Sequence, residues 1–233
     1  MSASLDPRLF ELLASLDSCS VANAVDASGV RLANEGFSDR RISCLTPRLN
    51  PTVGLVVTLK VKSTEPPMKK TFYLDHPDWW ELLKSESTPR VLVIEDVDAR
   101  PGRGSLVGPV HACILKAFGF VGVITNGAIR GRSSFERMGM GAFAGNISPA
   151  HAYSHVIEAG VPVEVAGLRV APGDLVHGDE NGVVMVPPAV VDNVVVAAQS
   201  FHQRERRICE YCGSGGFSTE GLRRMMGSDE SRR

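Results

Sequence analysis

Hydrophobic side chains recur at helical spacing in the first 28 residues. Asp6 precedes Pro7, a pair typical of a helix start, because the carboxylate caps free amides and proline already has a helical φ angle. Leucines then repeat on one face over residues 9–16. Residues 20–28 show the same spacing before Gly29. The pattern predicts two packed helices at the amino terminus.

Residues 53–61 and 90–97 are largely apolar and rich in β-branched side chains, which is typical of buried strands. A glycine-rich stretch follows at residues 101–108, and residues 109–118 have a helical pattern that starts on a proline. Residues 121–125 are again strand-like. The order predicts a βαβ unit, and hence an α/β fold class.

Residues 126–130 follow this unit as a predicted loop, the place where α/β proteins hold their ligands. The second half is predicted to be rich in β structure, with short strands at residues 161–165, 168–170 and 182–186 separated by turns. Two further helices are predicted, at residues 76–85 and 188–211. We expect one domain over residues 1–200 and a helical, partly polar tail over residues 201–233, peripheral or frayed beyond Gly213.

Composition narrows the function classes. Hydrophobic residues make up 43% of the 233 residues and the net charge is -1, so a globular protein is expected and nucleic acid is not an expected partner. The amino terminus lacks a secretory pattern, and the apolar residues 183–198 are interrupted by prolines and polar residues, which predicts no membrane segment. The five cysteines are scattered and odd in number, which suits a reducing compartment better than a disulfide framework. We therefore expect a cytoplasmic protein.

One group of residues in the βαβ unit could bind an anion. Gly108 precedes the predicted helix, whose first free amides are those of Val110 and His111, and such amides favour a carboxylate or an enolate. Arg130, at the end of the next strand, could grip the same anion with two parallel hydrogen bonds. Alternatively, Arg130 pairs with a surface carboxylate, and the spacing leaves both interpretations open.

The segment GPVHACILKAFGFVGVITNGAIR resembles the RraA-like family, which includes the 4-hydroxy-4-methyl-2-oxoglutarate aldolases. The matching residues are Gly108, Gly119, Gly122, Gly127 and Arg130. Similar agreement is found in SCSVANAVDASG, VGLVVTLKV, FAGNISPAHAY, PVEVAG and APGDLVHGDENGVVMVP, so the resemblance covers roughly residues 8 to 190.

The resemblance implies a layered α/β/β/α sandwich that assembles into homotrimers or homohexamers. It also implies a lyase that cleaves or decarboxylates short oxo- or hydroxy-carboxylates, with Mg²⁺ or Mn²⁺ steadying the pyruvate enolate. Gly108, Val110, His111 and Arg130 would bind the acid, with Arg130 and His111 as the catalytic residues. The alternative implied by the same family is a non-catalytic regulator that inhibits a ribonuclease or another partner by contact.

Two positions depart from the pattern of the aldolases. Gly131 stands where they have a metal-anchoring aspartate, and Pro109 stands where they usually have an acid. Mg²⁺ requires oxygen ligands, so the metal ligands of this chain are unknown and a metal cofactor is an open question. Replacement oxygens could come from Asp96, Asp98 or Glu136. The favoured interpretation is that these acids are solvated or pair with nearby arginines, namely Arg100, Arg132 or Arg137.

His111 could act as a base, because an imidazole at a helix start beside an arginine is expected to stay neutral. The alternative is a structural role within the helix. His151 and His155 are spaced to share one face of a helix started by Pro149, where they could form a metal pair, although a structural role is favoured.

Two other features have a simple interpretation. Cys209 and Cys212 form a single C-x-x-C, and a redox or zinc role there would require an ordered tail and converging thiols. Asp179 and Glu180 could reach the pocket of a neighbouring subunit, but a turn between strands explains them adequately.

Overall fold

The structure is a computed structural model that describes residues 6–67, 83–84 and 89–227. Within these residues nine strands form one mixed sheet, and two form a separate hairpin. The order in the sheet is β1-β6-β5-β3-β2-β10-β11, with β4 beside β5 and β7 beside β2. The strands are β1 (Ser43–Cys44), β2 (Thr52–Lys62), β3 (Arg90–Asp96), β4 (Ser105–Val107), β5 (Phe120–Ile129), β6 (Gly141–Ile147), β7 (His155–Ala159), β8 (Val163–Val165), β9 (Leu168–Val170), β10 (Leu175–Asp179) and β11 (Gly182–Val186).

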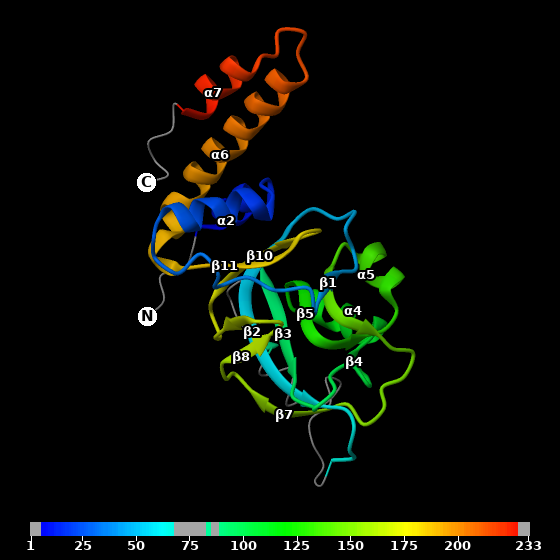
Figure 1. Cartoon of the computed structure of the whole chain (residues 1–233). Helices are drawn as coiled ribbons and strands as arrows, with labels where there is room; N and C mark the ends of the chain where they lie inside the picture. Colours follow the sequence, from blue (N-terminus) through cyan, green and yellow to red (C-terminus); the bar gives the residue numbers. More distant parts are fainter. Residues whose placement is uncertain (1–5, 68–82, 85–88, 228–233) are drawn as a thin grey trace.

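The centre of the sheet is parallel, because β2, β3, β5 and β6 run in the same direction. Helix α4 (Pro109–Ala117) connects β4 to β5, and α5 (Arg132–Met138) connects β5 to β6. The carboxyl ends of these strands therefore meet at one edge of the sheet, where α/β proteins place their sites. This arrangement puts the beginning of α4 next to the end of β5 (Figure 1).

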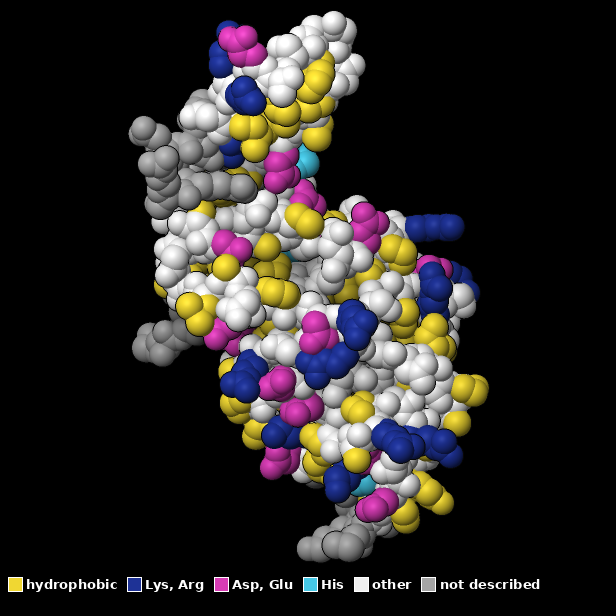
Figure 2. Space-filling view, in the orientation of Figure 1, with side chains coloured by type: hydrophobic (Ala, Val, Ile, Leu, Met, Phe, Trp, Pro, Cys, Tyr) yellow, Lys and Arg dark blue, Asp and Glu magenta, His cyan; other side chains and the backbone are white. Residues whose placement is uncertain are grey.

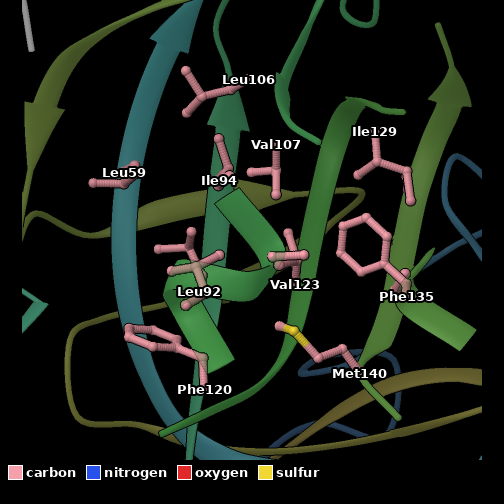
Figure 3. Packing of buried hydrophobic residues seen from close by; sticks show 14 of the residues in the cluster. Leu59, Leu92, Ile94, Leu106, Val107, Phe120, Val123, Ile129, Phe135 and Met140 are labelled. Carbon is pink, nitrogen blue, oxygen red and sulfur yellow. The ribbon is translucent and has the colours of Figure 1, made fainter. Parts of the chain in front are cut away.

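Strand β3 is buried on both of its faces. Leu92 and Ile94 belong to an apolar cluster that includes Ala112 and Leu115 of α4 and Phe135 of α5. In Figure 3 Phe135 lies next to Ile129 of β5. Val91 and Val93 point to the opposite face, where they pack with the hairpin of β8 and β9. Successive residues of a strand face opposite sides, so an uninterrupted apolar run requires a covering layer on each side.

A third apolar cluster lies over β10 and β11. Helices α1 (Pro7–Ala14) and α2 (Ser18–Ala27) pack there with the first half of α6 (Val191–Cys212), which follows a short 3-10 turn. The second half of α6 and α7 (Thr219–Gly227) extend away from the sheet (Figure 1).

The α/β fold class predicted from the sequence is confirmed, and most predicted elements are present. The loop predicted at residues 126–130 is wrong, because β5 continues to Ile129 and pairs there with both β4 and β6. Beyond Gly213, where a peripheral or frayed tail is predicted, the chain forms α7, which lies away from the sheet as a peripheral element and is not frayed over Thr219–Gly227. The helix predicted at residues 76–85 falls mostly outside the described residues. The predicted domain boundary at residue 200 lies inside α6, and the extent of the domain stays a prediction.

No helix in the described part of the chain is long and apolar enough to cross a membrane. On the face shown in Figure 2, acidic and basic side chains lie interspersed over the body of the protein. This mixed distribution agrees with the small net charge of the sequence.

His177 on β10 ties the sheet to the amino-terminal helices. Its Nε2 donates to the carbonyl oxygens of Leu13 and Leu16, each 3.0 Å away, while its Nδ1 is buried without a partner in the described structure. Burial lowers the pKa of His177, although the carboxylates of Asp179 and Asp17 oppose this shift. The folded protein therefore favours the neutral imidazole.

We predict that His177 makes the protein sensitive to acid. Because its pKa is lowered on folding, its stabilising effect is complete above about pH 6.5, the range of a free histidine, and is lost as the pH falls below it. Thermal unfolding measured across this pH range should show that Tm declines as the pH falls. The decline should be weaker in His177→Gln, because glutamine keeps a hydrogen-bond donor but has no titratable group. A decline in Tm that is unchanged in His177→Gln would contradict this assignment. His202→Gln is the control, because His202 is exposed and its substitution should leave the decline in Tm unchanged.

Candidate functional site

Arg130 follows β5 directly and lies next to the strand that leads into α4. Its amide donates to the carbonyl oxygen of Val107, the last residue of β4, over 3.2 Å. The pairing of β4 with β5 thereby places Arg130 beside Gly108, the residue before α4. The two predicted halves of the anion site are thus brought together by strand pairing.

The side chain of Arg130 runs across Gly108. A Cβ atom added to Gly108 would lie 2.8 Å from Arg130 Nε, closer than real Cβ contacts, and 3.1 Å from Arg130 Cγ, which is tighter than most. Glycine at this position therefore lets the guanidinium approach the start of α4. Pro109 has no amide hydrogen, so the first amides of the helix are those of Val110 and His111. The Val110 side chain is 68% exposed.

Arg130 has unused hydrogen-bonding capacity. Its Nε is buried and has no partner, and Arg130 forms no ion pair with any carboxylate among the residues that the structure describes. The alternative of a surface salt bridge is therefore not supported within this part of the chain. A buried donor without a partner is costly, and a bound anion would satisfy it.

His111 is buried, and its Nδ1 accepts a hydrogen bond from the Gly108 amide at 3.4 Å. In this arrangement a neutral His111 carries its proton on Nε2, so it is a hydrogen-bond donor there and not a base. The structural role weighed for His111 is thus present in the structure. The base role predicted from the sequence has no support in this tautomer.

The predicted helix carrying His151 and His155 is wrong. His151 lies in a turn that closes with a hydrogen bond from the Ser154 amide, and His155 begins β7. The ring of His151 instead meets the ring of His111 edge-on, with centroids 5.9 Å apart. Sequence spacing could not reveal this contact, because it joins two segments that only the fold brings together.

The three acids considered as replacement ligands are engaged elsewhere. Asp98 accepts hydrogen bonds from the amides and hydroxyls of Ser63 and Thr64, which outweigh the effect of burial and lower its pKa. Glu136 lies 3.5 Å from Arg132 in an ion pair along α5. Glu136 thus pairs with an arginine, as favoured from the sequence, whereas Asp98 is held by Ser63 and Thr64.

Asp96 lies at the end of β3, and burial raises the pKa of its carboxyl group. The carboxylate accepts hydrogen bonds from the amides of Gly102 and Asp98, at 2.8 and 3.1 Å. A cavity of about 730 Å³ opens beside it, and its lining also includes Glu95, Asn126 and Glu164. No sequence pattern predicted this cavity, which forms only where the ends of β3 and β5 meet the β8–β9 hairpin. Arg130 does not line it.

The remaining candidates agree with their simple interpretations. Asp179 accepts hydrogen bonds from the amide and hydroxyl of Ser18, which explains it without a ligand. Cys209 and Cys212 are exposed in the last turn of α6. The tail is therefore helical at this point, but no group of three His, Cys, Asp or Glu side chains in the described residues could hold a metal.

Residues 19–185 match the model of the RraA-like family, described as Aldolase/RraA. The chain belongs to the RraA-like family. A relative named putative 4-hydroxy-4-methyl-2-oxoglutarate aldolase, from Halalkalibacterium halodurans, is 24% identical over 163 residues, which cover 67% of this chain and 77% of the relative.

Two solved structures support the RraA-like fold. An uncharacterized protein from Pseudomonas syringae pv. tomato has a TM-score of 0.75 at 20% identity, over 98% of this chain and 97% of its own. Streptomyces coelicolor RraAS2, described as an unusual member of the RNase ES inhibitor RraA protein family, has a TM-score of 0.68 at 22% identity, over 88% of this chain and 98% of its own. At these identities the likeness concerns the fold alone.

The divalent metal implied by the resemblance to RraA-like aldolases does not fit the residues present. Gly131 and Pro109 offer no side-chain oxygen, and Asp98 and Glu136 have other partners. A Cβ atom added to Gly131 would lie only 2.6 Å from Pro109 Cγ, so a side chain at position 131 would meet the proline ring. The family's metal-anchoring position is therefore both chemically and sterically altered.

One amide fixes the strand ends that support this RraA-like site. Asn126 Oδ1 accepts from the Asp96 amide at 2.7 Å, and Asn126 Nδ2 donates to the Asp96 carbonyl at 3.0 Å. These two bonds join β3 to β5 four residues before Arg130, and we call them the Asn126 clamp. They lie just beyond Ile94 and Thr125, the last paired residues of the β3–β5 ladder.

We predict that Asn126→Ala lowers the free energy of unfolding by about 1–3 kcal/mol, because it leaves the amide and carbonyl of Asp96 without these partners. Urea unfolding would measure the loss. The matched variant Asn181→Ala, at an exposed turn, should change the free energy by no more than about 0.5 kcal/mol. Equal effects of the two substitutions would rule out the proposed clamp.

Proposed function

We propose that this RraA-like protein is a carbon–carbon lyase that binds a small oxo- or hydroxy-carboxylate at Arg130. The observation that carries the proposal is the buried Arg130 Nε without a partner, held against Gly108 at the start of α4. A carboxylate placed there would meet a permanent positive charge and the amides of Val110 and His111. The name of the Halalkalibacterium relative supports this class of reaction.

Arg130 would serve two steps of such a reaction. It would first orient the acid end of the substrate by donating a forked pair of hydrogen bonds to the two carboxylate oxygens. When the carbon–carbon bond breaks, the other fragment leaves as CO2, or as a carbonyl compound whose hydroxyl proton passes to solvent water. The electron pair of the broken bond moves onto the remaining carbonyl to form an enolate, and the same guanidinium would stabilise the developing negative charge. His111 would contribute its amide and a neutral imidazole, positioned by the bond from Gly108.

A specific feature also favours the second candidate function, a regulator that binds another protein by contact. Apolar side chains are exposed close to the site: Val110 on α4 is 68% exposed, and Ile147, which pairs with Ile129 at the end of β5, is 47% exposed. An exposed apolar surface suits a protein contact. The description of RraAS2 as belonging to an inhibitor family agrees with this candidate.

We further propose that a second copy of the chain covers this apolar surface in a homotrimer or homohexamer. Arg130 does not line the cavities that lie near the β8–β9 hairpin or the cavity between α6 and α7. An enzyme requires an enclosed pocket to exclude water from its substrate, so a second copy would have to cover Val110 and Ile147.

Pyruvate release from 4-hydroxy-4-methyl-2-oxoglutarate and from oxaloacetate tests the lyase proposal. We expect turnover by the unaltered protein and a loss of roughly 10²–10³-fold in kcat for Arg130→Ala, because the enolate loses its main stabilising charge. Arg132→Ala is the matched control, since Arg132 pairs with Glu136 and should leave the rate unchanged.

The same variants separate a lyase from a site that binds carboxylates without cleaving them. If the unaltered protein binds pyruvate but releases none from either substrate, and Arg130→Ala abolishes the binding, the site binds carboxylates without lyase activity on them. If Arg130→Ala and Arg132→Ala have the same rates and affinities as the unaltered protein, Arg130 is not the site.

A further inference from the structure

We infer that Pro109 and Gly131 interlock at the place of the family's metal ligands, so that the Arg130 site binds its carboxylate without a divalent cation. The inference rests on the proposed function for the ligand, and on geometry alone for the interlock. The two departures from the aldolase pattern, Pro109 and Gly131, thus form one paired change. The reasons are steric, chemical and electrostatic.

The steric reason lies at the start of α5. Gly131 has φ of +72°, a left-handed conformation that favours glycine, and it is the residue before α5. A Cβ atom there would lie 2.6 Å from Cγ and 3.0 Å from Cδ of Pro109. Both atoms belong to a closed ring whose φ is fixed, so they cannot swing aside as the end of a long side chain can. The proline ring thus requires glycine at position 131.

The chemical reason is that the pair has no metal ligand. Mg²⁺ and Mn²⁺ bind carboxylate, carbonyl and water oxygens, and neither Pro109 nor Gly131 has a side-chain oxygen. Asp98 and Glu136 are held by Ser63, Thr64 and Arg132. No cluster of three metal-binding side chains occurs in the described ranges of the chain.

The electrostatic reason is that the site is already cationic without a metal. The guanidinium of Arg130 lies against the amino end of α4, whose amides carry partial positive charge. These charges suffice to attract a carboxylate. A second oxygen next to the carboxylate, as in an α-oxo acid, would normally gain by chelating a metal. Here it gains at most one hydrogen bond, so the ligand class is carboxylates in general and not chelating oxo-acids alone.

Thermal unfolding tests the interlock. Gly139 is the matched control, because it has φ of +64° at the other end of α5 and nothing within 4 Å of an added Cβ atom. We expect Gly139→Ala to lower Tm by about 2–4 °C through backbone strain alone, and Gly131→Ala to lower it more. In the Pro109→Ala background the loss caused by Gly131→Ala should shrink to that of Gly139→Ala. Equal losses for the two glycines in the native background would overturn the interlock.

Ligand binding tests the absence of a cation. Calorimetric titration of the purified full chain with pyruvate and with propanoate should give affinities within roughly tenfold of each other, the value of one hydrogen bond. We expect the same affinities in EDTA and in millimolar Mn²⁺, and no binding to Arg130→Ala. Electron paramagnetic resonance of free Mn²⁺ should show no uptake by the native protein.

Other results would overturn the inference in distinguishable ways. Pyruvate binding that requires Mn²⁺, or Mn²⁺ uptake at this site that Gly131→Ala abolishes, would show that the cation is retained. Carboxylate binding that persists in Arg130→Ala would contradict the proposed function and the ligand part of this inference together. In that case the Tm values of the Gly131→Ala, Gly139→Ala and Pro109→Ala variants would still test the interlock, because they do not involve a ligand.

Discussion

The covering of both faces of the parallel strands is the constraint on which this structure depends. Val91 and Val93 face one way and Leu92 and Ile94 the other, so β3 is stable only between two apolar layers. Helices α4 and α5 provide one layer, and the β8–β9 hairpin provides the other. Because the helices must return along the sheet to join parallel strands, each begins at the edge where the previous strand ends.

The candidate site is a consequence of that edge. The short strand β4 pairs with the end of β5, which places the start of α4 against Arg130. Glycine at position 108 permits the close contact, and Asn126 holds the neighbouring strand ends together through the backbone of Asp96. The helix start, the arginine and the strand clamp are thus parts of one junction, supported by the core beneath it.

The same junction contains both positions at which the sequence departs from the aldolase pattern. Pro109 and Gly131 are far apart in the sequence, but they touch in the structure. A proline ring at the start of α4 leaves room only for glycine before α5, so the two positions restrict each other. Membership of the RraA-like family therefore describes the fold securely and the chemistry only in outline, because function resides in the site and not in the fold.

Hydrophobic spacing and local turn chemistry determined much of the fold from the sequence. The start of α1 at Pro7, the strands β9 and β11, and the start of α4 were all predictable, because caps, prolines and periodic side chains act within a few residues. The pairing of Gly108 with Arg130 was predictable from the βαβ unit and from the resemblance to the family.

Tertiary structure alone decided the rest. Strand pairing extended β5 through residues that resemble a loop, because β4 and β6 supply partners for its backbone. The His111–His151 contact, the Asn126 clamp and the Pro109–Gly131 contact join distant segments, and no local pattern encodes such distances. The sequence by itself thus determined which residues could form elements and an anion site. Long-range packing decided which of those residues meet, because a contact energy exists only once the chain has brought the atoms together.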